Sequence, residues 1–124
     1  MTNQEAFDKV WDYFVAQGNE SAMEGLTCRL RTRDGRKCAI GCLIPDKVYE
    51  PYMDRLTIDE FDDLLYSHVS LEPLFYGTDR EFIDELRSAH DRDSGSIGDQ
   101  FTKDIRLNLL DLAAGFDLLV PSNH

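Results

Sequence analysis

Two cysteines and one histidine are the side chains of this chain whose chemistry could go beyond packing. Cys38 and Cys42 lie four residues apart in the stretch GRKCAIGCLIPD, and His90 is followed directly by Asp91. A thiolate paired with a histidine, whose ring is oriented by an acid, is the arrangement of a nucleophilic enzyme. Cys42 or Cys38, together with His90 and Asp91, is therefore the candidate catalytic group of a small hydrolase or transferase.

The same side chains allow two further interpretations. A structural zinc ion takes about four thiolate or imidazole ligands. Cys28, Cys38 and Cys42, with His90 or His68 as the fourth ligand, would supply them in a zinc-stabilised interaction module. The metal signal is weak because no Cys-x-x-Cys pair is present. In the simplest interpretation the cysteines are small core residues, and the histidine lies at the core edge on the apolar face of a helix over residues 78–92. No cofactor is expected.

No common catalytic motif accompanies these residues. The chain lacks a phosphate-binding loop, a dinucleotide fingerprint, a nucleophile-elbow serine and the HExxH zinc motif. The sequence therefore favours a binding protein over an enzyme.

The net charge of −11 is distributed unevenly over the 124 residues. Residues 29–37 hold five cations and one acid, a net charge of +4, whereas residues 46–85 hold twelve acids and three bases, a net charge of −9. The acidic part repels nucleic acid, so direct nucleic-acid binding is not expected. The basic ribbon is expected to pair with the acidic helices.

Four amphipathic helices are expected to position these groups. Three capping boxes, each a threonine followed three residues later by a glutamate, predict helix starts at Thr2, Thr57 and Thr78. Apolar residues at helical spacing follow each start and recur over residues 98–114. Gly18 is expected to end the first helix.

A β-hairpin is expected over residues 27–40, around the turn Asp34-Gly35. A three-residue loop would pair Leu30 with Cys38 and place the cysteine side chains inward, which fits the apolar pattern better than a two-residue turn. The predicted fold is therefore mainly α, an α+β domain formed by a compact bundle of about four helices and one small hairpin. With 124 residues, 42% of them hydrophobic, the chain suits a single globular domain over residues 1–124.

A resemblance extends this interpretation. The segment DGRKCAIGCLIPDKVYEP, a preceding Phe-Asp-x-Val helix that ends in Gln-Gly, and the later ELRSAHD resemble a group of small phage and bacterial proteins. The shared positions are Cys38, Ala39, Gly41, Leu43, Ile44, Asp46, His90 and Asp91. The resemblance implies a phage-encoded or bacterial protein and implies no particular reaction.

Together these observations predict a small acidic cytoplasmic protein that inhibits or modulates a host or defence macromolecule. The partner would be a protein with a basic surface, and the expected partner-binding carboxylates are Asp54, Asp59, Glu60, Asp62, Asp63, Glu72 and Asp79. The chain opens without a basic and apolar leader and lacks a run of about 18 apolar residues, so neither a signal peptide nor a membrane span is expected. For a phage protein the location would be the bacterial host cytosol, and self-association into a homodimer stays open.

Overall fold

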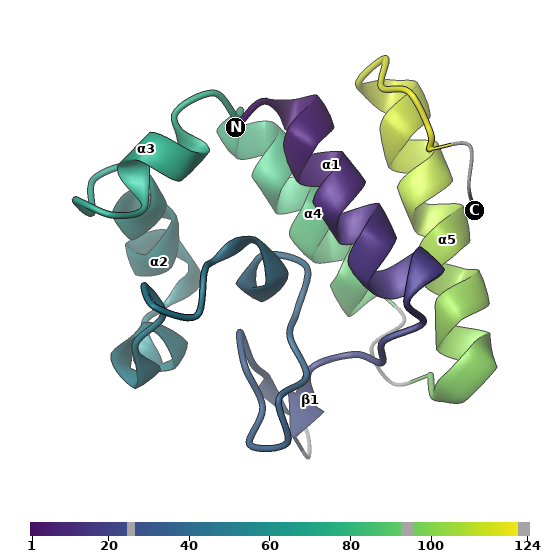
Figure 1. Ribbon diagram of the computed structural model, residues 1–124, viewed down its shortest axis with the longest axis horizontal. Coiled ribbons are helices and arrows are strands. Elements are labelled where there is room, and N and C mark those ends of the chain that lie inside the picture. The colour runs from purple at the N-terminus through teal and green to yellow at the C-terminus, as the bar shows by residue number, and fades with distance from the viewer. Residues whose placement is uncertain (25–26, 93–95, 122–124) are drawn as a thin grey trace.

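The computed structural model describes residues 1–24, 27–92 and 96–121, with only the backbone described for Glu24, Thr27 and Cys28. It is mainly helical, which confirms the expected class (Figure 1). The elements in chain order are α1 (Asn3–Trp11), the π-helical turn η1 (Asp12–Ala16), β1 (Met23–Glu24), β2 (Thr27–Cys28), the 3₁₀ turns η2 (Gly41–Leu43) and η3 (Pro51–Arg55), α2 (Ile58–Leu65), α3 (Glu72–Phe75), α4 (Arg80–Asp91) and α5 (Gly98–Gly115).

Three helices, α1, α4 and α5, form the main bundle, and α2 and α3 lie beside it (Figure 1). The apolar stripes of the sequence face this interior. The largest fully buried side chains are aromatic: Trp11, Phe7, Phe14, Phe75, Phe82 and Phe101. Burial of such rings is the main favourable contribution to folding.

The first two capping boxes are confirmed. The hydroxyls of Thr2 and Thr57 each accept the backbone N–H of the glutamate three residues later, and that glutamate accepts the threonine N–H in return. The first helix runs on through η1 and closes at Gly18, which has a φ of +70°.

The third expected box is wrong. Helix α4 starts after Asp79, and the Thr78 hydroxyl donates to the carbonyl of Phe75. Thr78 is buried against Tyr66, and the preceding Gly77 pairs with Thr2 in a parallel bridge. The Thr78 hydroxyl is therefore engaged by Phe75 and Tyr66 and does not cap the helix.

The expected hairpin over residues 27–40 is not formed as a ladder. Strand β2 pairs with β1 instead, so that Cys28 lies opposite Met23. The expected register survives in a single antiparallel bridge between Arg31 and Lys37, next to a hydrogen bond from Cys38 N to Leu30 O of 3.3 Å. Regular pairing stops there because the backbone N–H of Leu30 donates to the Asp54 carboxylate and the chain enters η2.

Within the described ranges, no helix combines the length and the apolar character needed to cross a membrane.

Candidate functional site

The thiols of Cys38 and Cys42 are held by local hydrogen bonds around η2. The Cys38 sulfur accepts the backbone N–H of Gly41 at 3.1 Å, and the Cys42 thiol donates to the carbonyl of Ala39 at 3.2 Å. Neither thiol makes a hydrogen bond to His90. The Cys28 side chain lies outside the described part of the chain.

Electrostatics keeps both thiols protonated. Packing around the Cys38 sulfur removes it from water and raises its pKa to about 11, although part of the residue remains open to solvent. Burial also raises the pKa of Cys42, and the neighbouring Cys38 adds to this increase. A nucleophilic cysteine needs the opposite shift.

His90 is fully buried and has both ring nitrogens engaged. Its Nε2 accepts the backbone N–H of Ala22 at 3.3 Å, which places the proton on Nδ1, and Nδ1 faces Asp91 Oδ1 at 2.9 Å. The rings of Phe14 and Phe101 pack against the imidazole, with centroids 5.5 and 5.8 Å away. This geometry makes His90 a connection between α4 and the segment before β1.

Of the candidate metal ligands, Cys38, Cys42, His68 and His90 lie in the described part of the chain, and the Cys28 side chain does not. In the part of the chain that the structure describes, no group of three or more histidine, cysteine or acidic side chains is placed to hold a metal ion.

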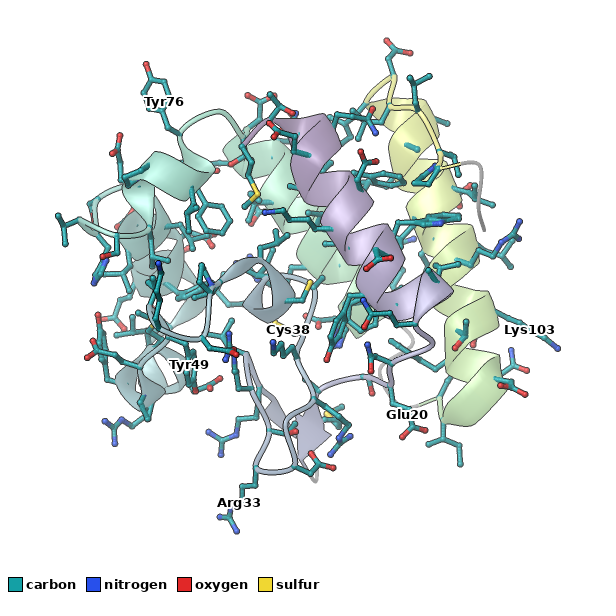
Figure 2. The ribbon with its side chains drawn as sticks, viewed as in Figure 1. Glu20, Arg33, Cys38, Tyr49, Tyr76 and Lys103 are labelled. Atoms are coloured by element: carbon teal, nitrogen blue, oxygen red, sulfur yellow. The ribbon has the colours of Figure 1, made fainter. Side chains whose placement is uncertain are left out.

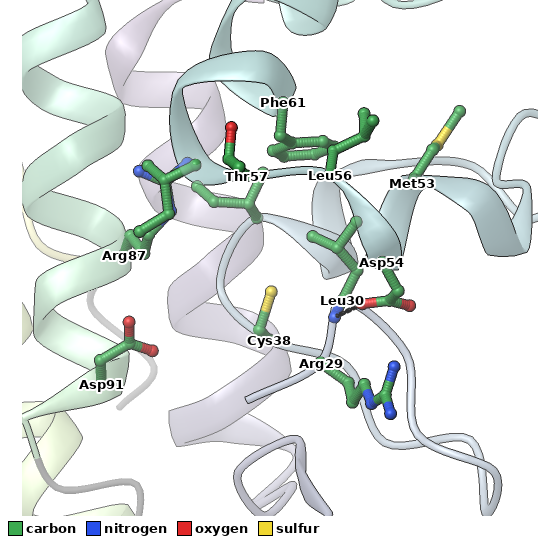
Figure 3. Close-up of a pocket in the computed structure, with 12 residues that line it drawn as sticks. Arg29, Leu30, Cys38, Met53, Asp54, Leu56, Thr57, Phe61, Arg87 and Asp91 are labelled. Carbon is green, nitrogen blue, oxygen red and sulfur yellow. Dashed lines mark hydrogen bonds between the residues drawn. The ribbon is translucent and has the colours of Figure 1, made fainter. Parts of the chain in front are cut away.

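Cys38 instead lines a small open pocket between the ribbon of residues 29–40, η3, the start of α2 and α4 (Figure 3). Its volume is about 160 Å³. The wall is largely apolar, and polar side chains from three elements join it. The apolar residues are Leu30, Ile40, Met53, Leu56, Ile58 and Phe61.

Two anchored charges shape the pocket. Asp54 accepts the backbone N–H of Leu30 at 2.6 Å and the hydroxyl of Tyr49, so it ties η3 to the ribbon. The hydrogen bond between Leu30 and Asp54 is drawn in Figure 3. Removal from water raises the pKa of Tyr49 to about 12, and the contact with Asp54 adds to this increase.

Across the pocket, the Arg87 guanidinium lies between two carboxylates. It binds Asp62 of α2 at 2.5 Å and Asp84 of its own helix at 3.0 Å. The Arg87 and Asp62 side chains are only 17% and 14% exposed, so this pair is shielded from solvent and joins α2 to α4. These carboxylates raise the pKa of Arg87 against the effect of its burial.

The seven expected partner-binding carboxylates divide into three sets. Asp54 and Asp62 are internal, as described above, while Asp63 and Asp79 are exposed but contact Arg80 and Asn3. The remaining three belong to the first turns of α2 and α3, and they are Asp59, Glu60 and Glu72.

Three cations of the basic ribbon form ion pairs with acids that lie near them in the chain, outside the acidic helices. Arg31 and Lys37 both bind Asp46, and Arg36 binds Asp34 at 3.0 Å. Arg33 marks the tip of the ribbon in Figure 2.

Comparison with models of known protein families, with curated proteins and with solved structures found no match to this chain.

Sequence reasoning missed the pocket and the role of Arg87. One signal was available: Arg80, Asp84, Arg87 and Asp91 recur at helical spacing and form one polar stripe on α4. The partner helix and the ribbon that complete the pocket are distant in sequence.

Proposed function

We propose that this protein acts by binding a macromolecular partner that has a basic surface, and that the exposed carboxylates of α2 and α4 make the contact. We call Asp59, Glu60, Asp63, Glu81, Asp84 and Glu85 the acidic face. The resemblance to phage and bacterial proteins makes a bacterial protein the first partner to seek.

The observation that supports the proposal is the excess of exposed carboxylates on two joined helices. Residues 54–85 hold ten acids and two arginines, a net charge of −8. The pairs Arg80–Asp63 and Arg87–Asp62 connect α2 to α4, so the exposed acids of both helices belong to one surface. Asp59, Glu81 and Glu85 are exposed, and their carboxylates have no hydrogen bond or ion pair among the described residues.

Such a surface favours fast, salt-sensitive association with a positively charged partner. The acids of the acidic face that carry no internal bond can each pair with a partner cation without losing a contact in the free protein. Asp62, by contrast, would have to give up Arg87.

The test is charge reversal. We expect the double variant Asp59→Lys/Glu85→Lys to lose the partners that the immobilised wild-type protein captures from a bacterial lysate at low salt. Captured proteins are identified by mass spectrometry, and binding of the purified partner is then measured at several salt concentrations.

The matched control is Asp99→Lys/Asp111→Lys on α5. Each pair combines one residue from the first turn of a helix with one from further along, and all four side chains are exposed. Each variant replaces two acidic residues by two lysines, so both change the net charge by the same amount. Equal binding by both variants, or binding that does not weaken with salt, would contradict the proposal.

A further inference from the structure

We infer that the pocket beside Cys38 receives one large apolar side chain, such as leucine, from a basic segment of the protein partner. This inference rests on the proposed function and adds the chemistry of the bound segment: lysines or arginines around one apolar anchor.

The size of the pocket supports a single side chain. Pockets for drug-sized ligands have volumes of roughly 300–1,000 Å³, whereas this one measures about 160 Å³. A cavity of about 150 Å³ with an apolar lining is large enough for a benzene molecule. The space therefore suits one aliphatic or aromatic side chain.

The lining suits an apolar group that enters from solvent. Phe61 and Met53 form a buried floor, being 5% and 1% exposed. Ile58 lines the pocket while 60% of its surface remains exposed, so it offers an apolar rim at the entrance. An arriving side chain would cover this rim as it fills the pocket, and both effects remove apolar surface from water.

The charges around the entrance favour a basic segment. Arg29 and Arg87 line the pocket together with Asp54 and Asp91. Asp62 and Asp84 bind Arg87, and Asp59 and Glu60 follow Ile58 in the first turn of α2. Six carboxylates thus surround two arginines, and this excess attracts cations rather than phosphate or another anion.

Anchored residues keep the pocket in place before any partner arrives. Asp54 fixes the ribbon at Leu30, and Asp62 fixes Arg87. Figure 3 shows Cys38 between these two sides, where its side chain faces the enclosed space. A preformed pocket lowers the ordering cost of binding.

Synthetic peptides test the inference directly. The probe is a fluorescent peptide of about a dozen residues in which alternating lysines flank one central leucine. Its two counterparts replace that leucine by alanine or all lysines by glutamate. Affinities are measured by fluorescence anisotropy at low salt. We expect the leucine peptide to bind at least about tenfold more tightly than the alanine peptide, and the glutamate peptide not to bind.

Two pairs of variants locate the bound side chain. Cys38→Met extends a flexible side chain into the pocket and should reduce the preference for leucine to less than about threefold, whereas Cys38→Ser leaves the space open and should retain it. Ile58→Ala should weaken binding of the leucine peptide, whereas Val69→Ala, at an exposed valine outside the pocket, should not. Thermal unfolding checks that each variant is folded.

The outcomes separate this inference from the proposed function. Suppose that the leucine and alanine peptides bind with equal affinity and that neither binds Asp59→Lys/Glu85→Lys. This result would contradict binding of a side chain in the pocket and would support binding at the acidic face. A leucine preference that Cys38→Met does not change would also contradict binding in the pocket. No binding of either lysine peptide at millimolar concentration, or dimerisation that Ile58→Ala abolishes, would rule out this occupant.

Discussion

Gly41 is the residue at which the ribbon meets the helical body. A Cβ atom at this position would lie 2.1 Å from the carbonyl oxygen of Leu30. That carbonyl is held by the backbone N–H of Cys38, and the backbone N–H of Leu30 is held by Asp54. The ribbon therefore cannot move aside without breaking hydrogen bonds, and only glycine fits.

We expect Gly41→Ala to lower the free energy of unfolding by about 3 kcal/mol or more, because the overlap involves backbone atoms. Urea denaturation followed by circular dichroism measures it. The control is Gly115→Ala, where a Cβ atom would meet nothing within 4 Å. This change at the end of α5 should be neutral or slightly stabilising. Similar stability of the two variants would show that η2 does not pack tightly on the ribbon.

The protonated thiols give a second prediction at this scale. Because burial raises the pKa of Cys38 to about 11 and also raises that of Cys42, iodoacetamide should alkylate these two thiols slowly in the native protein at about pH 8 and rapidly once urea unfolds it. Mass spectrometry assigns the modified residue. Rapid labelling of Cys42 in the native protein near pH 7 would contradict the structure and would support Cys42 as a nucleophile.

The same shift predicts sensitivity to alkali. Below the ordinary thiol pKa of 9.0, the Cys38 thiol is protonated in both the folded and the unfolded protein. Its contribution to the free energy of unfolding is then fully present. As the pH rises from about 9 to about 11, the unfolded chain ionises first, and the free energy of unfolding falls by up to about 2 kcal/mol. Cys38→Ser should show a shallower decline in denaturation experiments across this range. Identical slopes would mean that the thiol is open to water.

At the scale of elements, the local capping signals worked where the threonine hydroxyl accepts the backbone N–H of its own helix. Thr2 and Thr57 cap their helices as expected. Thr78 has the same spacing to a glutamate, yet it is buried against Tyr66 and bonds Phe75. The short helix α3 has four residues, too few to show a helical period in the sequence.

The Thr57 cap gives a prediction for α2. We expect Thr57→Ala to cost about 1 kcal/mol of stability, since the N–H of Glu60 loses its acceptor, and Thr57→Ser to cost far less. Urea denaturation of both variants provides the measurement. Equal losses would attribute the effect to the methyl group rather than to the cap.

At the scale of the whole molecule, the charge distribution sets the behaviour in salt. A net charge of −11 on 124 residues repels itself in the compact state. The basic ribbon of residues 29–37 carries a net charge of +4, which offsets only part of the negative charge on the rest of the chain.

We expect the free energy of unfolding to rise between about 20 mM and about 500 mM NaCl, because salt screens this repulsion. The rise should be smaller in Asp59→Lys/Glu85→Lys, which removes part of the excess charge. A free energy that falls with salt would show that the internal ion pairs outweigh the repulsion.

The sequence by itself determined the helical class, two of the helix starts and the acidic character of residues 54–85. These properties depend on apolar period, capping and charge, which act between residues a few positions apart. Only the tertiary structure decided which groups are available for chemistry or binding. Asp54 meets Leu30 across 24 residues, Arg87 meets Asp62 across 25, and His90 meets Ala22 across 68. Such contacts leave no local pattern, and they place Cys38 beside a small pocket and His90 in a buried contact with Ala22.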